Sequence, residues 1–312
     1  MEGELARKHG LEFLELPASG VMGRGVGGVL SGMGWLGTGI PKALYEVWHF
    51  RPDAVIGFGG YAGFCPVLAA RLLGIPTAVH EQNSVPGVTN KVLGKMVKRI
   101  FLSFPDTLGI FPADKTFLTG NPVRPEIFKA GEQRRGRTAG RRLFVFGGSQ
   151  GARPINDAVI EALPRLRDAG VEIVHQAGRI DFSRVRAAYR AAGADPDQVR
   201  EFIDDMGAEY AACDLVVCRS GASTVFEIAA AGAPALFVPF PQATHDHQTM
   251  NARAMSDLGA AELLPQRDLS GAALADRVLE LLADKSRLES METAARGMAR
   301  QYAARDLSLI HI

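Results

Sequence analysis

The stretch RSGASTVFEIAAAGAPALFVPFPQATHDHQTMN, residues 219–251, gives the clearest indication of the fold of this 312-residue chain. It follows a short, apolar, β-branched run at 214–217, which is typical of a buried strand. Small residues at 220–223 predict a turn, and good helix formers predict a helix over 224–231. A second strand is expected over 235–238. The order of strand, loop, helix and strand indicates an open α/β sheet, in which ligands bind at the carboxyl ends of the strands.

Two interpretations of Thr224 and Glu227 remain open on spacing alone. Thr followed three residues later by Glu is typical of a capping box at a helix start, and its frequency favours this interpretation. The alternative is a ligand site, because a carboxylate here could accept hydrogen bonds from a sugar diol. In either case the helix starts over Gly and Ser, where backbone N–H groups can face an anion.

The composition limits the class of protein. Hydrophobic residues make up 47% and charged residues 22%, as in folded globular proteins, and the length suits two domains. The net charge of +1 argues against nucleic-acid binding, which usually needs a large basic excess. Cys65, Cys213 and Cys218 lie in apolar segments without metal-ligand spacing, so we expect them to be buried and reduced. The apolar stretches are broken by Gly and Pro, so no transmembrane helix is expected.

A second Gly-rich turn, GGSQGA at 147–152, follows a strand expected at 143–146 and precedes a helix expected at 154–166. A Gly-rich turn between a strand and a helix aims backbone N–H groups at a phosphate. The turn lacks the Lys-Ser/Thr ending of a P-loop and the full GxGxxG spacing. It therefore indicates neither a nucleoside triphosphatase nor a dinucleotide enzyme. A further strand is expected at 172–176.

The first half of the chain also alternates short strands with helices. Period-2 alternation predicts a half-exposed strand over 11–16. Four more strands are expected, at 53–56, 77–79, 99–104 and 116–119. A helix is expected over 41–50, with Pro41 in its first turn, and another over 66–73. The Arg-rich segment 126–142 is expected to be a solvated basic linker.

The segment from Val21 to Ile40 is Gly-rich and apolar, and two interpretations of it remain open. It could be a flexible connection that packs some side chains into the core, or an exposed apolar patch that suits an anionic membrane surface. Its apolar members are Val21, Met22, Val26, Val29, Leu30, Met33, Trp35 and Leu36, with Arg24 among them. The cations that could add to such a patch are Lys91, Lys95, Lys98 and Arg99.

Three motifs together resemble glycosyltransferase family 28, in its branch for peptidoglycan synthesis. They are GNPVR at 120–124, GGSQGA at 147–152 and the stretch 219–251, and they occur in the family's order. The resemblance implies an α/β protein with the GT-B arrangement, two Rossmann-like domains facing across a cleft. The two domains are expected to differ in the substrate that they bind.

The domain boundaries follow from these motifs. We expect an acceptor- and membrane-facing domain over 1–125, the linker over 126–142, and a domain that binds the UDP-sugar over 143–312.

The resemblance implies an inverting transfer of N-acetylglucosamine from UDP-N-acetylglucosamine to lipid I, which is undecaprenyl-pyrophosphoryl-N-acetylmuramyl-pentapeptide. The product would be lipid II, made at the cytoplasmic face of the cell membrane by a peripheral protein. The implied partners are this donor, lipid I and an anionic membrane surface, with no nucleic acid, metal or cofactor. Alternatives with the same fold are a UDP-N-acetylglucosamine 2-epimerase and a glycolipid glucosyltransferase. A UDP-sugar-binding module without catalysis is an alternative of another class.

The resemblance also implies which residues bind substrate. It places Arg124, Ser149 and the helix start at Ala222 near the donor diphosphate. It places Ile203 beside uracil, Glu227 at the ribose and Gln248 at the sugar hydroxyls. The full donor set is Asn83, Arg124, Ser149, Ile203, Ala222, Ser223, Thr224, Val225, Phe226, Glu227 and Gln248. In the Gly-rich turn at 57–63, Gly60 and Tyr61 are placed near the acceptor.

One family element is not found in the sequence. Relatives begin with a strand and a glycine-rich loop of the form GGTGGH, whose histidine is the favoured general base for the acceptor hydroxyl. The residues at the start of this chain resemble a point beyond that unit, so we expect an N-terminally incomplete first domain with an exposed strand edge. His80, in the run HEQN at 80–83, is the nearby candidate for a base.

Overall fold

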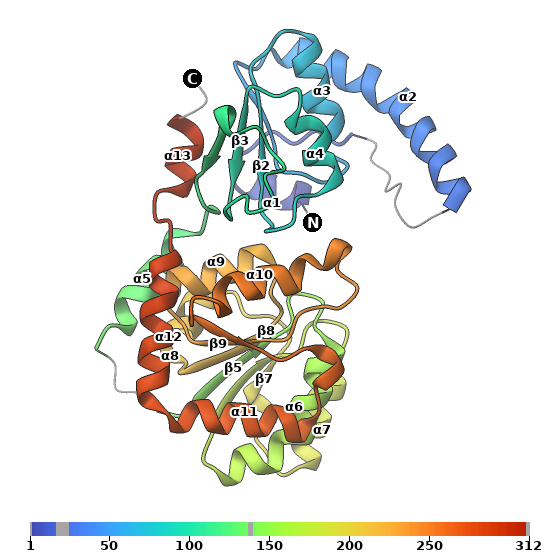
Figure 1. The fold of residues 1–312 in the computed structure, drawn as a ribbon. Helices are drawn as coiled ribbons and strands as arrows, with labels where there is room; N and C mark the ends of the chain where they lie inside the picture. Colours follow the sequence, from blue (N-terminus) through green and yellow to red (C-terminus); the bar gives the residue numbers. More distant parts are fainter. Residues whose placement is uncertain (1, 17–24, 137–139, 310–312) are drawn as a thin grey trace. The chain divides into compact units, whose positions relative to one another are not determined.

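The computed structural model describes residues 2–16, 25–136 and 140–309, with the backbone alone for 2, 5, 25–35 and 309. The chain forms two compact units (Figure 1). Unit 1 is built mainly from residues up to Leu118, and unit 2 from Asn83–Val85 and Thr119–Asp306. The division therefore falls earlier than the expected boundary at 125.

Unit 1 contains a four-stranded parallel sheet with the order β1-β2-β3-β4. Its strands are β1 (Val55–Gly57), β2 (Thr77–Glu81), β3 (Arg99–Leu102) and β4 (Thr116–Leu118). Its helices are α1 (Glu2–Lys8), α2 (Gly25–Phe50), α3 (Phe64–Leu72) and α4 (Val88–Gly94), with a 3₁₀ turn at Ala113–Lys115. Val79 and Ile100 of the central strands are fully buried and pack against Leu93 of α4.

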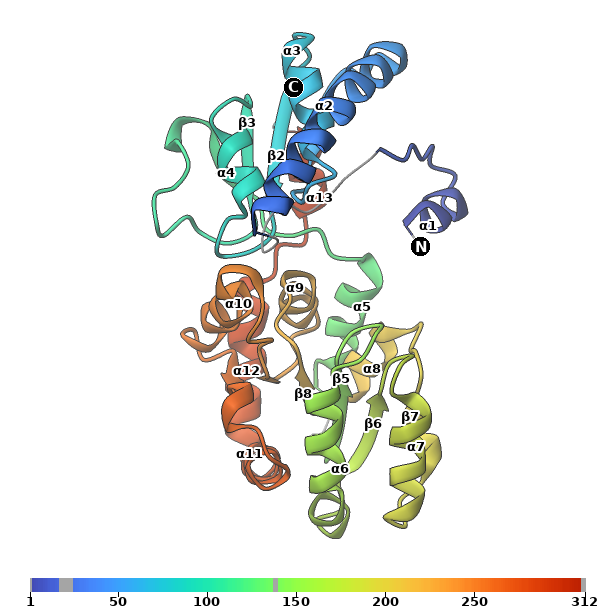
Figure 2. The same cartoon turned by 90° about the vertical axis from the view of Figure 1, so that its right-hand side faces the viewer.

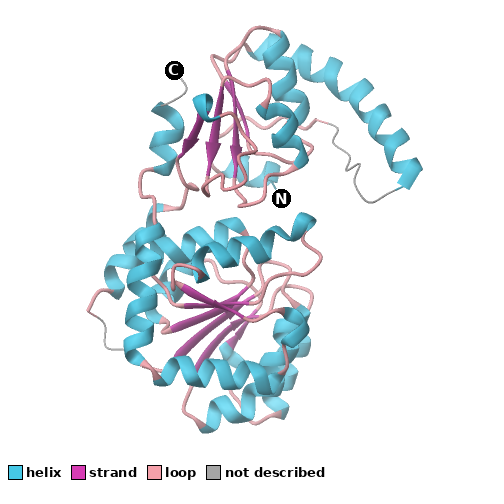
Figure 3. Ribbon diagram, in the orientation of Figure 1, coloured by secondary structure: helices cyan, strands magenta, loops and turns pink. Residues whose placement is uncertain are grey.

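Unit 2 contains a six-stranded parallel sheet with the order β10-β9-β8-β5-β6-β7 (Figure 3, magenta). The strands are β5 (Arg142–Phe146), β6 (Glu172–Gln176), β7 (Val199–Arg200), β8 (Leu215–Cys218), β9 (Ala235–Phe237) and β10 (Ala261–Leu263). Strands β8 and β9 are buried at every position, which explains why they read in the sequence as short continuous apolar runs. The register pairs Leu143 with Leu215 and Val217 with Leu236, so the central strands end at a common edge.

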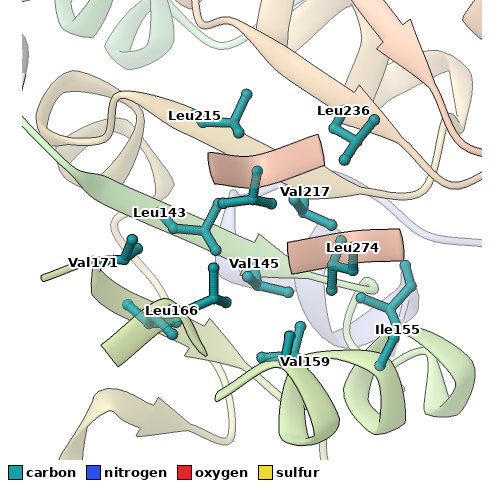
Figure 4. Close-up of a cluster of buried hydrophobic side chains, with 14 of the residues drawn as sticks. Leu143, Val145, Ile155, Val159, Leu166, Val171, Leu215, Val217, Leu236 and Leu274 are labelled. Carbon is teal, nitrogen blue, oxygen red and sulfur yellow. The ribbon is translucent and has the colours of Figure 1, made fainter. Parts of the chain in front are cut away.

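The helices of unit 2 cover both faces of this sheet (Figure 2). They are α5 (Pro125–Arg134), α6 (Arg153–Asp168), α7 (Phe182–Ala191), α8 (Met206–Ala212), α9 (Ala222–Ala231), α10 (His247–Ser256), α11 (Gly271–Ala283) and α12 (Lys285–Met298). Three 3₁₀ turns lie at Pro196–Gln198, Thr244–Asp246 and Gln266–Asp268. Helix α6 packs with α7 and α11, while α9 packs with α5, α8 and α12. Apolar side chains of β5, β8, α6 and α11 interlock in the core (Figure 4).

The end of the chain, α13 (Ala303–Leu309), contributes an apolar side chain to unit 1. Leu307 is 8% exposed and packs with Ala78 and Phe101. This contact accounts for the apolar character of residue 307 near the end of the chain. Among the helices of the described ranges, none has the length and apolarity needed to span a membrane.

The strand expected over 11–16 is wrong, because these residues form no regular structure. Leu11, Phe13 and Leu14 are exposed, at 63%, 42% and 52%. An alternating pattern stabilises a strand only where a neighbouring strand accepts its hydrogen bonds, and among the described strands none pairs with this segment.

The helix expected to start at Pro41 begins instead at Gly25, and Pro41 lies in its interior. Apolar side chains recur at helical spacing along its second half, and they pack with α3. They are Leu36, Ile40, Ala43, Leu44 and Val47. This packing outweighs the poor helix propensity of Gly and Pro. Leu36 thus packs against the core of unit 1, whereas Val21, Met22 and Arg24 lie outside the described residues.

The solvated linker expected at 126–142 is also wrong in part, because α5 occupies its first half. Arg134 is only 5% exposed, and its guanidinium donates hydrogen bonds to the carbonyl oxygens of Tyr210 and Cys213. Gly131 lets α5 approach α9 closely, since a Cβ there would lie 2.5 Å from the carbonyl oxygen of Ala230. The helix and its arginine are parts of unit 2.

Candidate functional site

The carboxyl ends of the adjacent strands β5, β8 and β9 meet at one edge of the sheet of unit 2. The loops that follow these strands line a cavity of about 550 Å³. A cavity of this size at this edge is suited to a small ligand, as in other open α/β sheets. Its polar lining includes Arg153, Arg219, Thr224, Gln242, Gln248 and Gln266.

The Gly-rich turn at 147–152 forms one wall of the cavity. Gly151 has a φ of +83° and touches the next turn, since a Cβ there would lie 2.2 Å from the carbonyl oxygen of Ala177. Gln176 ties this wall to the loop after β7, because its amide donates to the carbonyl oxygen of Gly148 (3.3 Å) and accepts from the N–H of Ile203 (2.8 Å). Ile203 therefore lies beside the Gly-rich turn, and Ser149 is exposed on that turn.

The start of α9 forms a second wall. The capping-box interpretation of Thr224 is wrong, because the N-cap is Gly221 and no side chain caps the helix. Ala222, Ser223 and Thr224 are thus the first helical residues, and Thr224 lines the cavity. The N–H groups of a first helical turn have no partner within the helix, so they can bind an anion. Val225 and Phe226 are buried in the core.

Glu227 lies one turn along α9 and has two partners from distant parts of the sequence. Arg124 donates to Oε1 at 3.2 Å, and the Tyr210 hydroxyl donates to Oε2 at 3.2 Å. The Glu227 side chain is 20% exposed and that of Arg124 56% exposed. The structure therefore brings together the two charged side chains expected at the donor diphosphate and ribose, in addition to a tyrosine that sequence analysis missed.

Arg219 is a second site residue that sequence analysis missed. Its guanidinium donates to the carbonyl oxygens of Val238 (2.9 Å) and Pro239 (3.0 Å) and to Oε1 of Gln266 (2.7 Å). Burial lowers its pKa to about 10, so it remains charged at neutral pH. Its position directly after a buried strand and before Ser-Gly was the available signal.

Asn251, fully buried at α10, connects two predicted residues. Its Oδ1 accepts from the N–H and the hydroxyl of Ser84, both at 2.9 Å. Its Nδ2 donates to Oδ1 of Asn83 (3.1 Å) and to the carbonyl oxygen of Ser220 (3.2 Å). The Ser220 hydroxyl in turn donates to the carbonyl oxygen of Gln248 at 2.8 Å. Asn83 and Gln248 are therefore both held around the loop that precedes α9.

The other predicted residues lie in unit 1. His80, inside β2, is fully buried, with Nε2 at 3.2 Å from the Ser103 hydroxyl and Nδ1 at 3.4 Å from the Gln82 amide. The same Gln82 amide donates to the carbonyl oxygen of Phe58 at 2.9 Å, which holds the turn that carries Gly60 and Tyr61. Gly60 is exposed at the tip of this turn. The role of His80 as a base stays a prediction. A base must lie within hydrogen-bond distance of the proton that it accepts, and in this structure the ring nitrogens of His80 face Ser103 and Gln82.

Comparisons with known proteins identify the family. The glycosyltransferase family 28 C-terminal domain matches residues 142–307, and the N-terminal domain of the same family matches residues 1–102. A UDP-N-acetylglucosamine--N-acetylmuramyl-(pentapeptide) pyrophosphoryl-undecaprenol N-acetylglucosamine transferase from Nitratidesulfovibrio vulgaris (Miyazaki F) is 51% identical over 97% of this chain and 84% of its own length. Its namesake from Solidesulfovibrio magneticus is 52% identical over 98% of this chain and 85% of its own length.

Solved structures agree with this match. MurG of Acinetobacter baumannii superimposes with a TM-score of 0.81 and 32% identity, over 100% of this chain and 88% of its own. A putative UDP-N-acetylglucosamine 2-epimerase of Listeria monocytogenes has a TM-score of 0.65 at 15% identity, over 99% of this chain and 83% of its own, and shares the fold alone. The α/β, GT-B fold class is thus confirmed, and the expected N-terminal incompleteness is not supported by matches of this coverage. The chain belongs to glycosyltransferase family 28.

Proposed function

We propose that this protein transfers N-acetylglucosamine from UDP-N-acetylglucosamine to N-acetylmuramyl-(pentapeptide) pyrophosphoryl-undecaprenol. The observation that carries the proposal is the identity of 51–52% over at least 97% of the chain with transferases of that name. The cavity of unit 2, lined by a Gly-rich turn and the start of α9, agrees with a donor that carries a diphosphate. The similarity to the epimerase is too low to favour epimerisation.

In this proposal residues in the cavity and around it each bind one part of the donor. The start of α9, Ser149 and Arg124 face the diphosphate, where an arginine fork and helix N–H groups both favour negative charge. Ile203 packs against the uracil and the Glu227 carboxylate accepts from the ribose hydroxyls. Gln248 and Asn83, held around the loop before α9, bind the sugar.

The reaction is an inverting displacement. The 4-hydroxyl oxygen of the muramyl sugar attacks the anomeric carbon, the bond from that carbon to the UDP oxygen breaks, and the hydroxyl proton passes to a base. Negative charge grows on the departing diphosphate, so Arg124 and the α9 dipole stabilise the transition state more than the ground state. His80 is the proposed base, with Gly60 and Tyr61 near the acceptor.

We propose further that unit 1 binds an anionic membrane surface at the cytoplasmic face, because the acceptor is lipid-linked. Helix α4 carries the exposed apolar residues Val88 (47%) and Val92 (44%) beside Lys91 and Lys95. Apolar side chains flanked by cations are suited to an anionic headgroup layer. Sedimentation with phosphatidylglycerol vesicles, but not with phosphatidylcholine vesicles, is expected. Lys91→Glu/Lys95→Glu should weaken it, whereas Lys285→Glu in unit 2 should not.

The transfer is tested with radiolabelled UDP-N-acetylglucosamine and lipid I. We expect a lipid-extractable product with one added N-acetylglucosamine, little product from UDP-glucose, and no free N-acetylmannosamine. Glu227→Gln should raise the donor KM, while Glu289→Gln, on the exposed surface of α12, should leave it unchanged. Release of N-acetylmannosamine would instead support the epimerase, and donor binding without turnover would support a binding module.

A further inference from the structure

Tyr210 contacts the Glu227 carboxylate from the interior of unit 2. It lies on α8, is fully buried, and its ring packs edge-on against Phe144 and Phe146 with centroid distances of 5.8 and 6.1 Å. Its carbonyl oxygen accepts a hydrogen bond from the buried Arg134 at 2.7 Å. Both the ring and the backbone are thus fixed by contacts within unit 2, so the hydroxyl has a fixed position.

In this position the Tyr210 hydroxyl binds one oxygen of the partly exposed Glu227 carboxylate. It donates to Oε2 of Glu227 at 3.2 Å, while Oε1 is bound by the more exposed Arg124. Burial, followed by the nearby Glu227 charge, raises the pKa of Tyr210 well above its ordinary value. The hydroxyl is therefore a permanent donor, and the hydrogen bond keeps Oε2 turned toward the protein interior.

A carboxylate that binds a ribose must have a defined orientation. The two neighbouring hydroxyls of the ribose are both donors, and a carboxylate can accept from both only if its plane is correctly oriented. A glutamate side chain has several rotatable bonds, and ordering it at the moment of binding costs free energy. A partner that fixes the carboxylate beforehand removes that cost and raises affinity for a ligand with both hydroxyls.

We propose that Tyr210 is a positioning residue that orients the Glu227 carboxylate for the vicinal diol of the donor ribose. The inference rests on the proposed donor function and adds to it a determinant of selectivity for ribose over sugars without the diol. Tyr210 acts through Glu227 and does not itself touch the nucleotide. Loss of the Tyr210 hydroxyl should therefore weaken only those ligands that use Glu227.

The test is titration calorimetry with UDP and with 2′,3′-dideoxyuridine diphosphate, on the full chain and its Tyr210→Phe variant. We expect Tyr210→Phe to weaken UDP binding by about 10- to 100-fold, the effect of one hydrogen bond to a charged group, and to weaken binding of the dideoxy nucleotide by less than about twofold. In a Glu227→Gln background, Tyr210→Phe should have little further effect on UDP.

Tyr189→Phe is the matched control, because Tyr189 is another fully buried tyrosine of unit 2, bound to His175 and not to Glu227. It should weaken both nucleotides equally or not at all. Equal losses for both nucleotides in Tyr210→Phe, or an unchanged affinity for UDP, would overturn the inference. Failure of the unmodified chain to bind either nucleotide would instead overturn the proposed donor function, so the two failures are distinguishable.

Discussion

His175 on β6 should make the stability of unit 2 depend on pH. The side chain is fully buried, and both ring nitrogens are hydrogen-bonded. Asn156 Nδ2 donates to the carbonyl oxygen of Ala177 (3.0 Å) and to Asp181 (2.8 Å), so its Oδ1 accepts from Nε2 of His175 at 3.0 Å. Nδ1 then accepts from the Tyr189 hydroxyl at 3.0 Å. Neutral histidine with its proton on Nε2 satisfies both of these hydrogen bonds.

The size of this pH dependence follows from the pKa of His175 in the folded and unfolded states. Burial, partly opposed by the Asp181 charge, lowers the pKa of His175 to about 3, whereas an unfolded chain has a histidine pKa of about 6.5. Between these values the unfolded state binds more protons, so stability falls as pH falls. The contribution is fully present above the unfolded pKa and is lost by about 1.4 kcal/mol per pH unit below it. From pH 7 to pH 5 the loss from His175 is about 2 kcal/mol.

Urea unfolding followed by circular dichroism measures this loss. The free energy of unfolding of the unmodified chain should fall by about 2 kcal/mol more, between pH 7 and pH 5, than that of His175→Gln. Comparing the two removes the pH dependence that carboxylates contribute to both proteins. If His175→Gln does not fold, NMR titration of the unmodified chain replaces it, and the His175 ring should not titrate above about pH 4. Equal pH dependence in the two proteins, or a His175 ring that titrates near pH 6, would show that burial does not keep His175 neutral.

Three further substitutions test other contacts. Gly151→Ala should lower UDP affinity by at least about tenfold in calorimetry, because a Cβ there would lie 2.2 Å from the carbonyl oxygen of Ala177; unchanged affinity would contradict the geometry of this turn. Leu307→Ala removes apolar contacts with the sheet of unit 1. It should lower the free energy of unfolding, measured by thermal unfolding, by about 2–3 kcal/mol but leave UDP affinity unchanged. Arg134→Met should lower the free energy of unfolding by about 3 kcal/mol, because the carbonyl oxygens of Tyr210 and Cys213 lose a buried donor. A variant as stable as the parent would show that water replaces the guanidinium.

Much of unit 2 could be predicted from the sequence. Its central strands are buried on both faces, so they appear as short apolar runs between turn residues, and these runs matched β5, β6, β8 and β9 closely. The Gly-rich turn could also be predicted, because a positive φ and a close backbone contact both require glycine. The resemblance to the family came from the motifs at 120–124 and 147–152 together with the stretch 219–251.

The failures have one physical origin, which is contact between residues distant in the sequence. The alternating run at 11–16 has the composition of a strand, but no strand in the described ranges pairs with it. The helix α2 passes through Pro41 because its apolar face packs with α3. Arg134 reads as a solvated residue in an Arg-rich segment, yet it binds carbonyl oxygens about eighty residues away in the chain.

The same origin explains the site residues that were missed. Tyr210 binds Glu227, and Arg219 binds the carbonyl oxygens of Val238 and Pro239, and no local spacing connects these partners. Thr224 and Glu227 fit a capping box as well as a ligand site until the structure places the N-cap at Gly221. A local pattern can indicate the chemistry of a residue, whereas its partners are set by the fold.

A crystal structure with UDP-N-acetylglucosamine would show whether the cavity of unit 2 holds the UDP-sugar, as we propose. We expect density for the diphosphate between the Gly-rich turn at 147–152 and the start of α9, with the ribose hydroxyls within hydrogen-bond distance of Glu227. Density for the nucleotide at any other place, or a ribose that does not contact Glu227, would contradict this proposal.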